Sequence, residues 1–306
     1  MDNLQKTAYC LSASGALVAP DCNRLIHENE GILDEEVWDP ESGETLHRDQ
    51  VGDGVKSNAP VAYVWYSNGS DLDDPDEDEG LGSGERLIFS ISPDNNIIAF
   101  KYDFEEDDIW KEDASGGIGK IELHPESGLA AAMSPQGLLL FFMTPNRRLQ
   151  AAVRTGGEEW TILPHFPAEP KIGTPLATTV TDNATILFYF GIDDTMHYLR
   201  RENMSEDWVD NAVENIIVES PITRFRASIE EDGHVEAYVL TNGRLLQLSN
   251  SGEPVDVGAV EERQLRKSND AQNIRWMSRG CRPYFYRVRY VVVYHYFVPR
   301  IRGLPW

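Results

Sequence analysis

The sequence predicts an all-β fold, a six-bladed β-propeller of four-stranded antiparallel blades. Short apolar runs flank tight polar turns, and this arrangement recurs at intervals of about fifty residues. A tryptophan follows the apolar runs in three of the units, as Trp110, Trp160 and Trp208, at separations of 50 and 48 residues. Units of four short strands at this period are typical of propeller blades, each of which buries its faces only against its neighbours.

Each repeat centres on a predicted hairpin. An apolar or aromatic run precedes a polar turn and a second run follows it, which favours two antiparallel strands. The four turns are Ser92–Asn95, Thr144–Arg147, Gly191–Asp194 and Thr241–Arg244. A further strand-like run lies upstream of each hairpin, at 61–66, 128–133, 174–180 and 222–229. Each unit therefore holds four short strands.

The blades follow one another along the chain. The interval from Trp38 to Trp110 is longer than the others, and we attribute it to the acidic insertion 71–79, a charge run that favours a solvated loop. Short strands with regular turns are also typical of a β-sandwich, but a sandwich does not require a tryptophan at the same position of every repeat. Five predicted blades occupy 6–45, 55–115, 125–165, 172–212 and 218–260.

The last segment differs in composition. Residues 1–260 hold blades one to five, whereas 261–306 form a basic, aromatic C-terminal segment with ten Lys or Arg against three acids. A closing sixth blade of Val-rich strands is one interpretation. An aberrant tail, as a wrong reading frame or a translated intron would give, is the other, and it leaves the sixth blade incomplete.

Composition excludes several classes of function. The 306 residues are 41% hydrophobic, which is ample for a buried core. Asp and Glu number 51 against 27 Lys and Arg, so the formal charge of -24 repels a phosphate backbone and no nucleic acid partner is expected. No apolar run approaches the roughly 20 residues of a membrane span. The oligomeric state is not specified.

Targeting signals are weak. The apolar stretch 16–19 is too short for a secretory signal, so no cleavable leader is expected. Cys10 and Cys22 can close a small disulfide loop in an oxidising compartment, and two buried free thiols are the alternative. Candidate glycosylation sites in predicted turns favour the secretory pathway without fixing the localisation; they are Asn68, Asn183 and Asn203.

Motifs for nucleophilic or metal chemistry are missing from the sequence. There is no Gly-x-Ser-x-Gly elbow, phosphate loop or His-Glu-x-x-His, and the seven histidines are scattered. No metal or cofactor is therefore expected. A propeller instead offers a central tunnel, which suits an apolar small-molecule pocket, although tapered core packing is the alternative. The predicted inner strands carry small residues at 130–132 and 177–179 beside the larger Tyr63, Trp65, Phe225 and Arg226.

One unit resembles a known repeat. The run from Arg86 through Tyr102, followed by Trp110, resembles the repeat of the fungal fucose-specific lectins, and the likeness covers 6–260. The resemblance implies a six-bladed propeller that binds sugar between blades. In that family an Arg, a Glu and a Trp grip the sugar through its hydroxyls and its apolar face.

The resemblance also implies that the sugar chemistry is lost. Arg86 stands at the Arg position, but later units place Leu138, Thr185 and His234 there. No carboxylate is found at the aligned Glu position, which is held by Ala19, Ala99, Ala151, Tyr198 and Gln247. We therefore expect the inherited lectin sites to be silent.

A second likeness points to an enzyme. The segments Ala8–Ser12 and Asp21–Arg24 are similar to the hetero-Diels-Alderases of fungal tropolone sesquiterpenoid biosynthesis. This resemblance implies a cycloaddition between a tropolone-derived o-quinone methide and the alkene of a humulenol-like sesquiterpene. Such a reaction needs no metal or redox cofactor, because a reactive pose and a hydrogen bond to the developing oxyanion lower the barrier.

The expected site residues follow from this activity. Arg86 and His197 are the predicted catalytic hydrogen-bond donors. Trp65, Tyr66, Tyr189 and Arg226 are the predicted substrate contacts, the aromatic rings stacking on the tropolone. A fucose-type lectin with degenerate sites is the alternative function, and an interaction module is a third. For each aromatic residue, packing within a blade is the alternative role.

Overall fold

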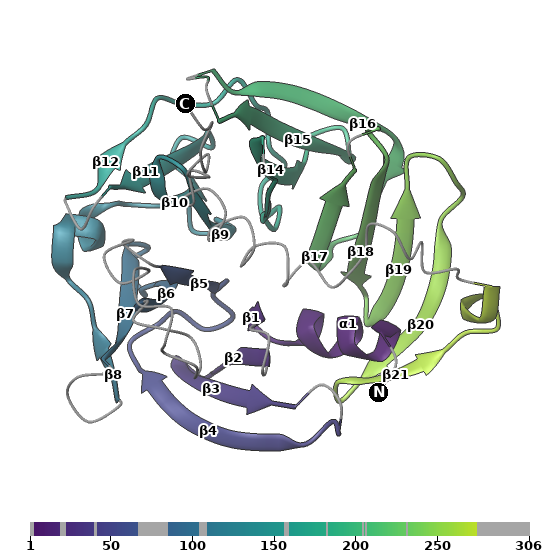
Figure 1. Cartoon of the computed structure of the whole chain (residues 1–306), viewed down its shortest axis with the longest axis horizontal. Coiled ribbons are helices and arrows are strands. Elements are labelled where there is room, and N and C mark those ends of the chain that lie inside the picture. Colours follow the sequence, from purple (N-terminus) through teal and green to yellow (C-terminus); the bar gives the residue numbers. More distant parts are fainter. Residues whose placement is uncertain are drawn as a thin grey trace, which may run out of the picture.

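A computed structural model describes residues 3–18, 23–39, 42–66, 85–103, 109–155, 159–181, 183–203, 205, 207–230 and 232–273. Their strands form five antiparallel sheets arranged as blades around a common axis (Figure 1). The prediction of an all-β propeller with small antiparallel blades is confirmed. The segment 274–306, where most of a sixth blade was expected, lies outside the described residues.

The strands follow one another outward in each blade. Blade one contains β1 (Gly15–Val18), β2 (Asn23–Asn29), β3 (Ile32–Trp38) and β4 (Thr45–Gly52). Blade two contains β5 (Ala62–Tyr66), β6 (Glu85–Ile91), β7 (Ile97–Asp103) and β8 (Ile109–Glu112). Blade three contains β9 (Leu129–Ser134), β10 (Gly137–Met143), β11 (Leu149–Arg154) and β12 (Thr161–Ile162).

Blades four and five continue the ring. Blade four contains β13 (Ala177–Val180), β14 (Ala184–Phe190), β15 (Thr195–Glu202) and β16 (Val209–Ile217). Blade five contains β17 (Ile222–Ile229), β18 (Val235–Thr241), β19 (Arg244–Ser249), β20 (Val255–Glu261) and β21 (Gln264–Lys267). Three helices complete the described elements: α1 (Asn3–Ser12), η1 (Ser115–Lys120) and η2 (Asp270–Asn273). None of these helices is long and apolar enough to cross a membrane.

The predicted hairpin turns join the second and third strands of blades two to five. The Asn95 amide donates to the Ser92 carbonyl at 2.9 Å in the β6–β7 turn. In the β18–β19 turn, Asn242 and Gly243 have φ values of 48° and 70°. A type I′ turn needs positive φ at both central positions, which Asn and Gly adopt most readily.

The core lies between the blades. Every residue of β10 is buried, because neighbouring sheets cover both of its faces. Leu140 and Phe142 pack in one apolar cluster with blade two, whereas Leu139 and Phe141 pack in another with blade four. Alternate residues of one strand thus hold two interfaces together.

A helix, which the sequence analysis did not expect, lies between blades one and five. The first blade was predicted to begin near residue 6, but α1 occupies this part of the chain (Figure 1). Leu4, Ala8 and Leu11 recur at helical spacing and share a cluster with blade five. On the side toward blade one, the Tyr9 ring stacks on Trp38 with centroids 4.4 Å apart. The helix therefore closes the ring of described blades.

Two further differences concern the ends of the repeats. Blade five extends to Lys267, because β21 pairs with β20 as a fifth strand. Trp38 lies on the third strand of its blade, whereas Trp110 lies on the fourth, so the two are not equivalent in phase. The long interval between them thus partly reflects their strand positions. The acidic run 71–79 lies outside the described residues.

The role of α1 in closing the ring is testable through Tyr9. Tyr9→Ala is expected to lower the free energy of unfolding by about 3–5 kcal/mol, because it removes a buried ring. Tyr9→Phe keeps the stack and is expected to cost about 1–3 kcal/mol, because the buried acceptor loses a donor. Urea denaturation measures both. Ile192→Ala is the control, since Ile192 is 68% exposed. A Tyr9→Ala cost as small as that of the control would contradict closure by α1.

Candidate functional site

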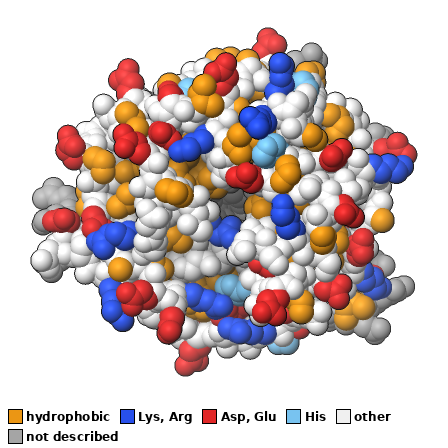
Figure 2. Space-filling model, turned by 180° about the vertical axis from the view of Figure 1, so that it is seen from behind, with side chains coloured by type: hydrophobic (Ala, Val, Ile, Leu, Met, Phe, Trp, Pro, Cys, Tyr) orange, Lys and Arg blue, Asp and Glu red, His pale blue; other side chains and the backbone are white. Residues whose placement is uncertain are grey.

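A cavity of about 930 Å³ lies at the centre of the ring. The innermost strands β1, β5, β9, β13 and β17 contribute to its wall, together with the end of α1. The structure therefore contains the expected central space. Figure 2 shows a hollow near the middle of the rear face, with hydrophobic, basic and acidic side chains around it. The volume is in the range of sites that take drug-sized molecules.

The wall is chemically uneven. Small apolar residues line it on β9, at 130–132. The β17 strand also lines the cavity, where burial alternates: Phe225 and Ala227 are buried and pack in the core, whereas the Arg224 and Arg226 side chains are partly exposed. The small apolar residues of β9 thus lie on one side of the cavity, and the two arginines of β17 lie on the other.

The Trp65 side chain contributes a hydrogen-bond donor that has no partner among the described residues. Its ring is partly buried against the core of blades two and three, and it lines the cavity. The indole Nε1 is buried and has no hydrogen-bond partner in the described part of the chain. A buried donor without an acceptor is costly.

The interface between blades one and two is built on a buried carboxylate. Glu35 of β3 is fully buried, and Arg86 Nη1 lies 3.0 and 2.9 Å from its two oxygens. The Trp110 indole donates to Glu35 at 3.3 Å, and the Tyr63 hydroxyl donates as well. Arg24 contributes a second guanidinium at 3.5 Å. We call these five residues the Glu35 cluster.

The Glu35 cluster contains a carboxylate that the aligned positions did not indicate. The Glu position of this unit is held by Ala99, but Arg86 has a carboxylate partner because Glu35 of the preceding blade binds it. Arg24, the second residue of β2 as Arg86 is of β6, was missed. With Glu35 at 0% and Arg86 at 2% exposure, this interface has no room for a sugar.

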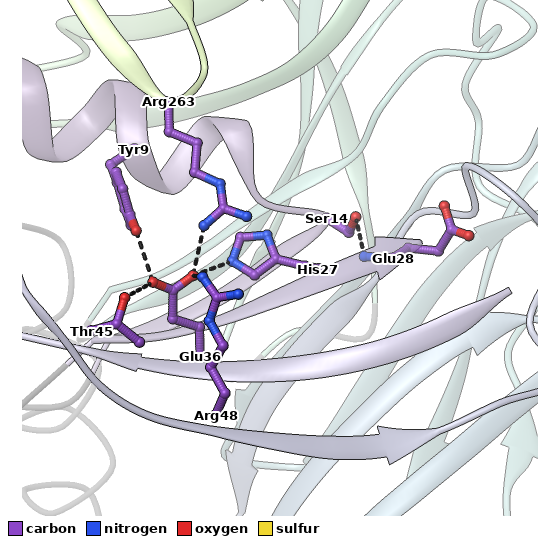
Figure 3. A network of polar contacts seen from close by, with 8 residues as sticks. All are labelled: Tyr9, Ser14, His27, Glu28, Glu36, Thr45, Arg48 and Arg263. Carbon is purple, nitrogen blue, oxygen red and sulfur yellow. Dashed lines mark hydrogen bonds and ion pairs between the residues drawn. The ribbon is translucent and has the colours of Figure 1, made fainter. Parts of the chain in front are cut away.

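The next residue forms a second cluster on the opposite face of β3. Glu36 is also fully buried, and Figure 3 shows donors converging on it from α1, blade one and blade five. The Tyr9 hydroxyl donates at 2.8 Å and Arg263 Nη1 at 2.7 Å. The Glu36 cluster comprises Glu36, Tyr9, His27, Thr45, Arg48 and Arg263.

Electrostatics keep Glu36 ionised. Burial raises the pKa of this carboxyl, but the hydrogen bonds from Thr45 and Tyr9 and the nearby positive charge outweigh it and hold the pKa at about 2. Burial also lowers the pKa of His27, and the charge of Arg263 adds to that effect. The charge that balances Glu36 at neutral pH therefore comes mainly from the arginines.

Blades three and four carry a different pairing. Arg154 lies over Trp160 at 5.6 Å from the ring centroid, and Arg201 lies over Trp208 at 4.9 Å. Each arginine lies on the third strand of its blade. Arg154 pairs with Leu138 and Arg201 pairs with Thr185, which are the positions where the lectin repeat would place an arginine. The guanidinium thus reaches the tryptophan from the neighbouring strand. An Arg six or seven residues before each Trp was the signal in the sequence.

Two of the predicted residues lie on blade four, away from the cavity wall. Tyr189 and His197 face each other across β14 and β15. The Tyr189 hydroxyl donates to Asp210 at 2.8 Å, and His197 Nδ1 lies 3.3 Å from the same carboxylate. The Asp210 carboxylate beside the ring raises the pKa of His197. Burial, and then Asp210, raise the pKa of Tyr189.

The structure therefore does not assemble the predicted site as one constellation. Trp65 and Arg226 line the cavity. Arg86 is enclosed in the Glu35 cluster, and Tyr189 and His197 belong to blade four. The Tyr66 side chain lies outside the described residues. The sequence identified the residue types but did not show which face of each strand they occupy.

The cysteine and sequon predictions have mixed outcomes. Cys10 is a buried free thiol whose pKa burial raises to about 11, which agrees with the second of the two alternatives given for this residue. Cys22 and Asn68 lie outside the described residues. Asn183 and Asn203 are adjacent at the end of the β14–β15 hairpin, where the Asn203 amide donates to the Asn183 carbonyl at 2.8 Å. Glycosylation at these two positions stays a prediction.

Comparison with known proteins supports the fold. No family model matches the sequence, and no curated protein matches it. Solved structures do match. AofleA from Arthrobotrys oligospora superposes with a TM-score of 0.59 at 14% identity, over 80% of this chain and 71% of that one. A variant of Aleuria aurantia lectin in complex with alpha-methyl-L-fucoside gives 0.58 at 15% identity, over 79% and 76%.

A third match agrees with these two. SapL1 lectin in complex with alpha methyl fucoside gives a TM-score of 0.56 at 16% identity, over 81% of this chain and 79% of that one. Aleuria aurantia lectin has a six-bladed β-propeller fold. This chain has the β-propeller fold of the fungal fucose-binding lectins. At these identities the likeness establishes the fold alone.

The Glu36 cluster makes stability sensitive to acid. The pKa of Glu36 is about 2 in the folded chain against an ordinary 4.5, so the folded form binds fewer protons. Glu36 therefore contributes up to about 3 kcal/mol to the free energy of unfolding. This contribution is fully present above pH 4.5 and is lost as the pH falls toward 2, the pKa of Glu36 in the folded chain. Urea denaturation across this range should show Glu36→Gln destabilised at neutral pH and less sensitive to acid. The exposed Glu30→Gln is the control. Parallel losses in wild type and Glu36→Gln would contradict the assignment.

Proposed function

We propose that this protein binds a small molecule in its central cavity. The observation that carries the proposal is the cavity itself, which has a volume of about 930 Å³ and is lined by small apolar residues together with polar and charged groups. The interface between blades one and two offers no comparable space, because Glu35 and Arg86 are buried against each other. Ligand binding therefore depends on the inner strands rather than on that interface.

Saccharide binding is a second candidate, and the comparisons favour it over catalysis. The matching solved structures include lectins in complex with a methyl fucoside. In this chain, Arg154 lies beside Trp160 and pairs with Glu85 at 3.4 Å. A guanidinium and a carboxylate suit sugar hydroxyls, and an indole suits the apolar face of a sugar ring.

Catalysis of a hetero-Diels–Alder reaction is the more specific form of the first proposal. The resemblance of Ala8–Ser12 and Asp21–Arg24 to the tropolone sesquiterpenoid branch supports it. The reaction joins an o-quinone methide to an alkene, forming one carbon–carbon and one carbon–oxygen bond with no leaving group. A cavity that holds both partners lowers the entropic barrier. The Arg226 guanidinium would donate to the developing oxyanion, and the Trp65 ring would contact the substrate. We place the reaction beside Trp65 and Arg226, because Arg86 and His197 do not line the cavity.

Titration with methyl fucoside tests saccharide binding. Calorimetry on wild type, Trp160→Ala and Ala131→Phe locates any site, since Trp160 lies in blade three and Ala131 lines the cavity. Loss of an aromatic stacking face is expected to weaken a sugar complex about tenfold, corresponding to about 1.4 kcal/mol. A site in blade three predicts this loss in Trp160→Ala and none in Ala131→Phe. No heat with wild type would remove the lectin candidate.

Product analysis tests the cycloaddition. The tropolone precursor is incubated with humulenol, with and without protein, and yield and diastereomer ratio are measured by chromatography. The proposal predicts a higher yield and one dominant diastereomer. Ala131→Phe should abolish the enhancement by filling the cavity, whereas the exposed Ile192→Ala should retain it. An unchanged product mixture with wild type would rule out the reaction for these substrates.

A further inference from the structure

We propose that the central cavity selects an organic anion with an apolar body, and that Arg224 binds its charged group. This inference rests on ligand binding in the cavity, as proposed above, and specifies the chemical class of the ligand. It depends on three features: an arginine without a carboxylate partner, a neighbouring acid that is already occupied, and an apolar wall opposite.

Arg224 differs from the arginines of the Glu35 and Glu36 clusters, which do not line the cavity. Its Nη1 donates to the Ser14 carbonyl at 3.0 Å, and no described carboxylate lies within ion-pair distance. Arg86 and Arg263, in contrast, each bind a buried glutamate. A guanidinium carries five N–H donors and stays charged, so most of the hydrogen-bonding capacity of Arg224 is unused. The side chain is half-buried and lines the cavity.

The acid that could neutralise Arg224 is engaged elsewhere. Glu28 also lines the cavity, but one of its oxygens accepts from the Gly31 amide at 2.8 Å and the other from the Asn58 amide at 2.7 Å. Its backbone amide donates to Ser14 Oγ (Figure 3). Burial lowers the pKa of Arg224, and the charge of Glu28 opposes this. A desolvated cation without an ion pair is unfavourable, and a ligand anion would relieve it.

The rest of the wall determines the body of the ligand. Arg226 lines the cavity two residues along β17 and adds positive charge on the same side. Small apolar residues of β9 and β13, including 130–132 and Ala177, leave space and present no charge. Glu126, the other acid of the wall, is exposed. Because the whole chain carries a formal charge of -24, attraction of an anion must come from this local arrangement.

A matched pair of fluorescent probes tests the inference. Anilinonaphthalene sulfonate and N-phenylnaphthylamine share an apolar aromatic body, and only the first carries a negative charge. We expect wild type to bind the sulfonate about tenfold or more tightly than the neutral probe, the effect of one hydrogen-bonded charge. Arg224→Gln should lose most of that preference while binding the neutral probe as before. Equal affinities in wild type, or an unchanged preference in Arg224→Gln, would overturn the inference.

Two controls separate this inference from the proposed function. Arg266→Gln removes one charge from the same blade, and because the Arg266 side chain is 74% exposed it should leave both affinities unchanged. Ala131→Phe should weaken both probes. If Ala131→Phe leaves both unchanged, the probes bind elsewhere and cavity binding itself fails. If it weakens both while Arg224→Gln changes neither, the cavity binds ligands and the anion preference fails. Thermal melting confirms that each variant is folded.

Discussion

Two adjacent buried carboxylates on β3 hold blade one to both of its neighbours. Successive side chains of a strand point to opposite faces, so Glu35 faces blade two and Glu36 faces α1 and blade five. A buried carboxylate is tolerated only when donors surround it, and neither glutamate finds them all within its own sheet. The Arg86 guanidinium and the Tyr63 hydroxyl supply them on one side. Separation of the blades is therefore unfavourable, because each carboxylate would lose the hydrogen-bond donors that keep it ionised.

This constraint also determines where a ligand can bind. The sequence resemblance to the fungal fucose-specific lectins led us to look for an arginine and a carboxylate between blades. Here the corresponding groups of blades one and two bind each other and are withdrawn from solvent. At the centre of the ring, the Trp65 side chain and the Arg224 guanidinium line the cavity, and no described carboxylate forms an ion pair with Arg224. The paired charges of Glu35 and Arg86 thus join two blades, whereas Arg224, which has no ion pair with a described carboxylate, is left to contact a ligand in the cavity.

The sequence predicted features that local chemistry determines and missed those that depend on contacts between blades. The turn at Asn242 and Gly243 was identified because positive φ restricts the residue types. The inner strands were identified because apolar runs precede each hairpin. The pairing of Glu35 with Arg86 spans 51 residues, and no local pattern encodes it. Tyr189 was chosen by residue type, but β14 is buried at every position, so periodicity does not show which face a residue occupies.

The most direct measurement is a crystal structure of the protein soaked with para-iodobenzoate, whose anomalous iodine signal marks the ligand. We expect an iodine peak inside the ring along the β9 wall, with the carboxylate against Arg224 and with Glu35 and Arg86 still in contact. Iodine between blades one and two, with Glu35 and Arg86 separated and the centre of the ring empty, would contradict it.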